Sequence, residues 1–220
     1  MRRFDEIFAI AADRKGGATA LEELLTKPVS PKNLAKIPED RWLAQFTKCI
    51  FQAGFNWKVI ENKWDGFESA FKGFDVDKCA MMDDRWFDAL LTDTSIVRNG
   101  PKIQTVPANA VFIQELRADG GIGKVIGGWS SEDYIGLLEM LKKRGSRLGA
   151  ATGQYSLRFL GKDAFILSRD VTARLIAEGV IDKPATSKTA LQAVQQAFND
   201  WRAQSDRSLT EISRVLAMSV

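Results

Sequence analysis

The sequence predicts an all-α fold. Apolar residues recur at spacings of three and four along almost the whole chain, and no stretch shows the two-residue alternation of a half-buried strand or a βαβ pattern. The chain has 220 residues, of which 45% are hydrophobic and 27% charged, the balance of a globular protein with its own core. We therefore expect a single domain over residues 1–220, built as two helical lobes flanking a cleft.

The first half of the chain holds several expected helices. One expected helix contains the apolar residues Trp42, Phe46 and Ile50 at helical spacing. Gly54 interrupts this helix. Short apolar segments follow at residues 67–74 and 86–91, and Asp83 or Asp84 can cap the second. A turn at Asn99-Gly100-Pro101 leads into another helix, which Pro107 should kink or split.

The second half carries clearer start and stop signals. Ser130 or Ser131 can cap a helix that continues through Leu141 and stops at Gly145, and a helix over residues 169–178 should end at Gly179. Ser187 begins a further helix, and Ser208 with Glu211 predicts a capping box for the last one. The Pro-bearing stretch 27–38 is expected to be a surface connection rather than a domain boundary.

Composition excludes several kinds of chemistry. The chain contains no histidine, which removes His-dependent nucleophiles, His metal ligands and imidazole acid or base catalysis. Cys49 and Cys79 form no CxxC pair, so neither a zinc site nor a disulfide framework is predicted. No apolar run is long enough to span a membrane, and the N-terminus meets charge too early for a signal peptide. We expect a cytoplasmic, monomeric protein without cofactor or metal.

Positive charge is concentrated in one segment. The net charge of the chain is only +3, but residues 141–175 hold eight basic and two acidic side chains. A local basic face is one electrostatic footprint of a phosphate-binding surface. A solvated helix face is the alternative, because basic runs are common on helices.

Two blocks of sequence resemble one known family. The first contains Phe51-Gln52-Ala53-Gly54-Phe55-Asn56-Trp57, then residues 67–75, Ile96 to Ile103 and Asn109-Ala110. The second contains Leu141-Lys142-Lys143-Arg144-Gly145 and continues to Thr152, Tyr155 and Ser156. In this order, from about Leu34 to Leu160, they resemble DNA-3-methyladenine glycosylase I, a family of helix-hairpin-helix DNA glycosylases. The resemblance implies an enzyme of base excision repair that binds duplex DNA and removes alkylated purines, chiefly 3-methyladenine, by base flipping.

The resemblance also implies a base pocket in the first block. Trp57 matches the family's base-stacking tryptophan, and an indole face attracts a cationic base. Phe55 and Gln52 are further pocket candidates, although Phe55 can simply pack and Gln52 can satisfy buried backbone. The alternative for Trp57 is a core aromatic, in a chain with 6 Trp and 13 Phe.

The chain departs from the family at two places, Cys49 and the zinc ligands, and from many relatives in the wider superfamily at Ser168. The resembling family itself works without the aspartate that those relatives carry. Cys49 occupies the position of the family's base-recognising glutamate, and a thiol supplies no negative charge unless its pKa is strongly lowered. The family's zinc ligands are missing. Ser168 stands where many relatives in the superfamily carry a catalytic aspartate, and Asp170, two residues later, is the candidate replacement. A carboxylate at a helix start is also a common partner of the helix dipole.

The second block is expected to anchor DNA. Glycines allow a tight turn before a helix whose first amides can bind a phosphate, and the basic residues ahead of it neutralise neighbouring phosphates. Arg98 and Lys102 can form a second phosphate contact. The candidates in the hairpin are Lys142, Lys143, Arg144, Arg147, Gly149, Thr152, Gly153, Gln154 and Tyr155.

Two other functions remain open at this point. Cys49 and Ser168 at the two acidic positions favour a non-catalytic protein that keeps the glycosylase fold and binds damaged DNA. The third possibility is an α-helical interaction protein without a role in nucleic-acid binding. Salt dependence of DNA binding separates it from the first two.

Overall fold

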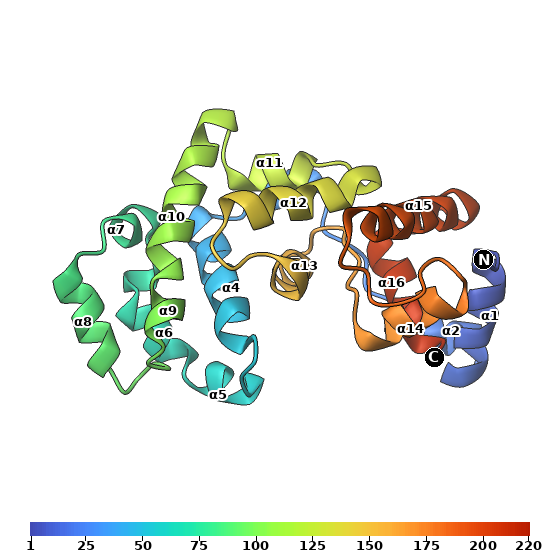
Figure 1. The fold of residues 1–220 in the computed structure, drawn as a ribbon, viewed down its shortest axis with the longest axis horizontal. Coiled ribbons are helices and arrows are strands. Elements are labelled where there is room, and N and C mark those ends of the chain that lie inside the picture. The colour runs from blue at the N-terminus through green and yellow to red at the C-terminus, as the bar shows by residue number, and fades with distance from the viewer. The chain divides into compact units, whose positions relative to one another are not determined.

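The computed structural model describes residues 1–220, which form helices and connecting loops with no β-strand (Figure 1). The predicted all-α class is therefore confirmed. The chain divides into two compact units. Unit 1 comprises Met1–Val29, Trp129–Leu137 and Gly161–Val220, and unit 2 comprises Ser30–Gly128 and Leu138–Leu160. The assignment of residues 1–220 to a single domain stays a prediction.

Unit 2 is built around α4, whose apolar face predicted a helix. Trp42, Phe46 and Ile50 are all buried in it, as the periodicity required. Helices α10 and α13 pack against α4. The elements of this unit are α3 (Pro31–Leu34), α4 (Glu39–Gln52), α5 (Trp57–Asn62), α6 (Trp64–Ala70), η1 (Lys72–Phe74), α7 (Val76–Ala80), α8 (Asp84–Thr92), α9 (Gly100–Ile103), α10 (Thr105–Glu115), η2 (Leu116–Asp119), α11 (Ile122–Gly128), the second part of α12 (Tyr134–Arg144) and α13 (Ala150–Phe159).

Local capping signals in unit 2 are confirmed. The Asp83 side chain accepts a hydrogen bond from the Trp86 backbone N–H at 2.8 Å and begins α8. Asn99 accepts from the Lys102 N–H at 3.1 Å and begins α9. Pro107 is the third residue of α10, and the helical segment is split after Ile103. A proline there sacrifices no intrahelical hydrogen bond, because the first turn of a helix has unpaired N–H groups.

Unit 1 contains the two helices with the clearest capping signals. Ser187 accepts from the Ala190 N–H, and Ser208 and Glu211 form the predicted capping box. Its core joins Phe165, Phe198 and Trp201 by ring contacts. The elements are α1 (Phe4–Lys15), α2 (Ala18–Leu24), η3 (Ser131–Asp133), the first part of α12, α14 (Arg169–Ala177), α15 (Lys188–Ser205) and α16 (Leu209–Met218).

Three features differ from or refine the expectations. Ser130 caps the short η3 turn, which leads into α12, and α12 ends at Arg144, just before Gly145. The stretch 27–38 contains the boundary between the two compact units, which lies between Val29 and Ser30, and its assignment as a surface connection within one domain stays a prediction. It also contains α3, whose Leu34 is buried. No helix combines the length and the apolar character that crossing a membrane requires.

Candidate functional site

A sharp turn after α4 shapes the main pocket of unit 2. Gly54 has φ +70°, in the left-handed region where glycine carries no steric penalty. Asn56 then begins α5, because its side-chain oxygen accepts a hydrogen bond from the Lys58 N–H at 3.0 Å. Trp57 is therefore the first residue of α5. The turn and the start of α5 form one wall of a pocket of about 580 Å³, and α4 and α13 supply the rest.

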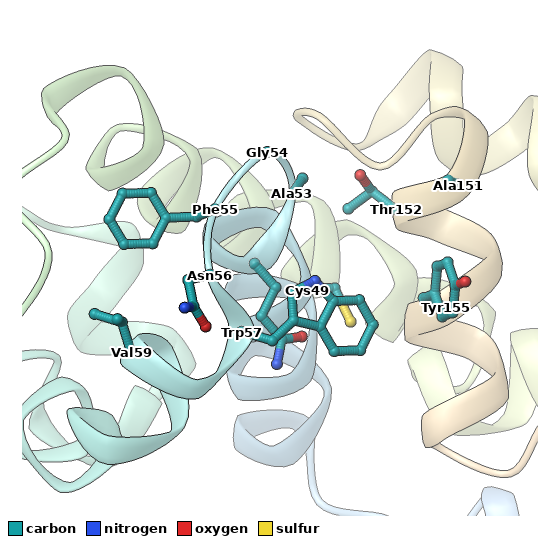
Figure 2. A pocket seen from close by; sticks show the side chains of 11 residues that line it. Cys49, Ala53, Gly54, Phe55, Asn56, Trp57, Val59, Ala151, Thr152 and Tyr155 are labelled. Atoms are coloured by element: carbon teal, nitrogen blue, oxygen red, sulfur yellow. The ribbon is translucent and has the colours of Figure 1, made fainter.

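The aromatic part of this pocket comes from two helices. Trp57 is 40% exposed, and Figure 2 shows its ring between α5 and α13, with Tyr155 on the facing helix. The Trp57 and Tyr155 rings meet edge to face, with centroids 5.5 Å apart, and Phe159 makes a similar contact at 6.0 Å. An indole this accessible has a free ring surface that a fully buried core tryptophan lacks.

The pocket contains no charged side chain. Its lining consists of Cys49, Gln52, Ala53, Gly54, Phe55, Asn56, Trp57, Val59, Ala151, Thr152 and Tyr155. Burial raises the pKa of the Cys49 thiol, and hydrogen bonds with Ser156 and Gln45 and the charge of Lys48 offset only part of that effect. Cys49 is thus a neutral thiol at neutral pH, so it places no negative charge where the family has a glutamate.

The four residues predicted for a base pocket lie in this one pocket: Cys49, Gln52, Phe55 and Trp57. Figure 2 shows that the Phe55 ring points away from Trp57, and Phe55 is 46% exposed. Thr152 and Tyr155, which sequence reasoning assigned to DNA contact, also line the pocket. Asn56, Val59 and Ala151 were not singled out from the sequence. Ala151 joins the site because α13 packs against α4.

A buried asparagine holds the loop between α12 and α13. Asn109 is fully buried in α10, its Oδ1 accepts from the Ser146 N–H at 2.7 Å, and its Nδ2 donates to the Ser146 carbonyl at 3.1 Å. These two hydrogen bonds clamp the backbone of the predicted hairpin. The role of Asn109 was not predicted from the sequence, although Asn109-Ala110 is part of the block that carries the family resemblance.

The basic residues of the hairpin are presented to solvent. Lys142, Lys143 and Arg147 are exposed, and Arg147 lies in the loop with φ +56°. Arg144 is engaged within the protein, since it pairs with Glu115 at 3.2 Å and lies over the Phe112 ring. Three of these four cations are therefore presented at the surface of unit 2 without such a pairing.

Among the other hairpin candidates, Gly153 and Gln154 are buried in α13, and Gly149 is partly buried at the start of that helix. A Cβ at Gly153 would come within 2.3 Å of the Leu148 carbonyl oxygen, and a Cβ at Gly149 within 3.2 Å of the Lys142 side chain. The absence of a side chain at Gly153 thus allows the turn to pack closely against α13. Contacts of Gly149, Gly153 and Gln154 with DNA stay predictions.

Arg98 and Lys102, the two residues predicted to form a second phosphate contact, have different surroundings in the structure. Arg98 is exposed, whereas Lys102 donates from Nζ to the carbonyls of Phe51 at 3.0 Å and Ala53 at 2.7 Å. Burial and the nearby charge of Arg147 lower the pKa of Lys102. Lys102 thus ties α9 to the end of α4 and supports the turn that carries Trp57.

Asp170 belongs to unit 1, whereas the pocket belongs to unit 2. It lies in the first turn of α14, where it pairs with Arg169 at 3.3 Å, and Ser168 caps the helix by accepting from the Val171 N–H. A catalytic role of Asp170 stays a prediction. No group of three metal-ligating His, Cys, Asp or Glu side chains converges in the chain.

Comparison with known proteins identifies the segment around the pocket. The family model for methyladenine glycosylase matches residues 39–135. The predicted family resemblance is confirmed. The matched segment includes α4 and α5, with Cys49, Gln52 and Trp57, and it ends before α13. No curated protein matches the chain.

Solved structures of 3-methyladenine DNA glycosylase I are similar to this chain in fold. A point variant in complex with 3-methyladenine is 22% identical, with a TM-score of 0.50, and the match covers 68% of this chain and 88% of that one. Another structure of this glycosylase is 21% identical, with a TM-score of 0.48 and coverages of 66% and 87%. The Staphylococcus aureus enzyme is 24% identical, with a TM-score of 0.48 and coverages of 62% and 80%.

Proposed function

We propose that this protein is a DNA glycosylase that removes alkylated purines of the 3-methyladenine type from duplex DNA. The observation that carries the proposal is the exposed Trp57, which lies in the segment that matches methyladenine glycosylases and lines a pocket without charged side chains. The pocket of about 580 Å³ falls in the size range of small-molecule sites. The reaction would be the first step of base excision repair.

The chemistry asks little of the protein beyond positioning. Methylation at N3 gives the adenine a positive charge, so its bond to the sugar is already weak. When this bond breaks, the electron pair goes to the base, which leaves neutral. Water then adds to C1′ of the sugar and loses a proton. The protein has to flip the base out of the duplex, which costs a few kcal/mol and costs less for a poorly paired lesion.

Trp57 is the residue that favours the cationic base. A cation over an indole face is stabilised by about 0.5 to 2 kcal/mol, with the larger values in desolvated sites. The pocket is largely apolar and no charged group in it competes for the base. The edge-on contacts with Tyr155 and Phe159 hold the ring in place, so stacking needs little reorganisation.

The hairpin of unit 2 would hold the DNA backbone. Lys142 and Lys143 are exposed cations in the last turn of α12, and Arg147 is an exposed cation in the following loop, which Asn109 clamps at Ser146. Such groups bind phosphates without reading sequence. This arrangement suits a protein that searches duplex DNA for a damaged base and recognises the damage in a separate pocket.

A second candidate is a damaged-DNA binding protein without catalytic activity. The neutral Cys49 thiol favours it, because the pocket then offers no carboxylate to orient water or to stabilise charge that develops on the sugar. Such a protein would prefer duplex with a lesion over undamaged duplex and release no base.

Release of free 3-methyladenine from methylated duplex DNA tests the proposal. At micromolar protein under single-turnover conditions, the wild type should release the base, and Trp57→Ala should reduce the rate about 2-fold to 30-fold. Trp86→Ala is the matched control, because Trp86 is partly exposed in unit 2 and does not line the pocket. Binding of lesion DNA without release would support the second candidate, and equal effects of both substitutions would move Trp57 out of the site.

A further inference from the structure

The side-chain amide of Gln52 has a buried oxygen without a hydrogen-bond partner in the wall of the pocket. Gln52 is the last residue of α4 and is only 3% exposed. It lines the main pocket and also an adjoining cavity of about 160 Å³, and Trp57 lines both as well. Its Oε1 atom is buried and accepts no hydrogen bond. A buried acceptor without a donor destabilises a fold by about 1 to 3 kcal/mol, so its retention points to a ligand.

Three polar side chains near the end of α4 already have hydrogen-bond partners. Gln45, one helical turn from Cys49, donates from Nε2 to the Cys49 sulfur at 3.2 Å. The Ser156 hydroxyl donates to the Thr152 carbonyl at 2.8 Å, and the Asn56 side chain caps α5. The unpartnered oxygen of Gln52 thus belongs to a residue that lines the same two cavities as the exposed Trp57. The adjoining cavity is also lined by the charged residues Lys48 and Glu61.

We propose that Gln52 determines specificity by reading the 6-amino edge of a flipped adenine-type base, a role that rests on the proposed glycosylase function. The Gln52 Oε1 accepts from the exocyclic amino group, and the amide N–H₂ next to it donates to N7. A glutamine amide pairs with these two atoms of adenine in a bidentate way. The Gln52 amide makes both hydrogen bonds without carrying a charge. Cys49, at the family's glutamate position, supplies no negative charge either.

This pairing rejects bases with an oxygen at position 6. In such a base both O6 and N7 are acceptors, so one of them must face the amide oxygen whichever way the amide is turned. A site that leaves a buried polar group unpaired discriminates strongly against the wrong ligand. A good bidentate contact corresponds to about a 5-fold to 150-fold preference for the right base.

Binding of free bases to the whole protein tests the proposal without depending on catalysis. The probes are 3-methyladenine and 3-methylhypoxanthine, which differ at the 6-substituent and the N1 proton, and the measurement is calorimetric titration. The wild type should bind 3-methyladenine about 10-fold to 100-fold more tightly. Gln52→Met, which has similar length and no amide, should reduce that preference to less than about threefold.

The stability of Gln52→Met also tests whether the amide oxygen lacks a hydrogen-bond partner in the ligand-free protein. Because Oε1 has no partner in the ligand-free protein, replacing it by an apolar group should leave the urea midpoint unchanged or raise it. Gln45→Met is the matched control on the same helix, and it should keep the preference for the amino base. Gln52→Glu retains the acceptor and should keep that preference even if the methionine variant does not fold.

The outcomes separate this proposal from the proposed function. Equal affinity of the wild type for the two bases overturns the role of Gln52, and release of 3-methyladenine from DNA would then leave the glycosylase function standing. No binding of either base overturns the role of Gln52 as well, and if base release is also absent the glycosylase function fails with it. A preference that survives in Gln52→Met assigns the discrimination to another group and overturns the proposal.

Discussion

Neutralising the exposed cations of the hairpin should change how DNA binding depends on salt. The perturbation is the triple variant Lys142→Gln, Lys143→Gln and Arg147→Gln. All three side chains are exposed in unit 2. Arg144 is left in place, because it already pairs with Glu115 and lies over Phe112, and its net contribution to phosphate binding should be smaller.

The magnitude follows from counterion release. Each phosphate neutralised by a cation adds about 0.9 to the slope of log affinity against log salt, so three lost contacts should flatten the slope by about 2.7. Between 50 and 200 mM salt, a flattening of 2.7 changes the ratio of wild-type to variant affinity about 40-fold. The variant should therefore bind much more weakly than the wild type at low salt and approach it at high salt.

Fluorescence anisotropy of a labelled duplex at several salt concentrations measures both slopes. The matched control is Lys27→Gln, Lys183→Gln and Lys188→Gln, three exposed lysines of unit 1, which changes the net charge by the same amount. The hairpin variant should lose slope and the control should lose little. Equal losses in the two variants would show that total charge acts, rather than this surface, and would refute the assignment of the hairpin to DNA.

Two further predictions concern stability. Asn109→Ala removes both hydrogen bonds to Ser146 and should lower the free energy of unfolding in urea by about 2 to 4 kcal/mol, whereas the exposed Asn33→Ala should change it by less than about 0.5 kcal/mol; similar values would contradict the clamp. Burial, with a smaller contribution from Asp75, raises the pKa of the Cys79 thiol to about 12. A raised folded-state pKa contributes stability below the unfolded pKa of about 9, and this stability is lost as pH rises further. The difference in unfolding free energy between wild type and Cys79→Ala should thus shrink by about 2 to 3 kcal/mol from pH 8 to pH 11, and parallel pH profiles would exclude this linkage.

Helix starts could be predicted well because capping is a local interaction. The side-chain oxygens of Asp83, Asn99, Ser187 and Ser208 each accept from a backbone N–H three residues later, and the sequence alone places such a residue beside its partner. Helix α1 was missed for a physical reason. Its buried residues are Phe4, Ile7, Ala11 and Ala12, and two alanines give only a weak periodic signal.

The pocket residues could be predicted where they lie close together in sequence, and could not be predicted where tertiary contacts bring them to the site. Cys49, Gln52 and Trp57 lie close together in sequence, and they line one pocket. Lys102 has the composition of a surface cation, yet its ammonium group donates to two carbonyls at the end of α4. Tyr155 belongs to the pocket because α13 packs on α4. Neither contact leaves a trace in the local sequence pattern.

An uncharged pocket changes how a cationic base would be selected. A carboxylate at the position of Cys49 would attract the lesion by its charge, but the buried thiol of Cys49 keeps its proton. Within the main pocket, attraction for the charge comes from the Trp57 face, about 0.5 to 2 kcal/mol, whereas Lys48 and Glu61, of opposite charge, line the adjoining cavity. Because an indole stacks on any base, this energy separates damaged from undamaged adenine only in part. The rest of the selectivity must then come from the lesion itself, through its weakened pairing and its weakened bond to the sugar. In this pocket Trp57 would hold whatever base is flipped, Gln52 would test its 6-amino edge, and the intrinsic lability of the methylated base would decide whether it is released.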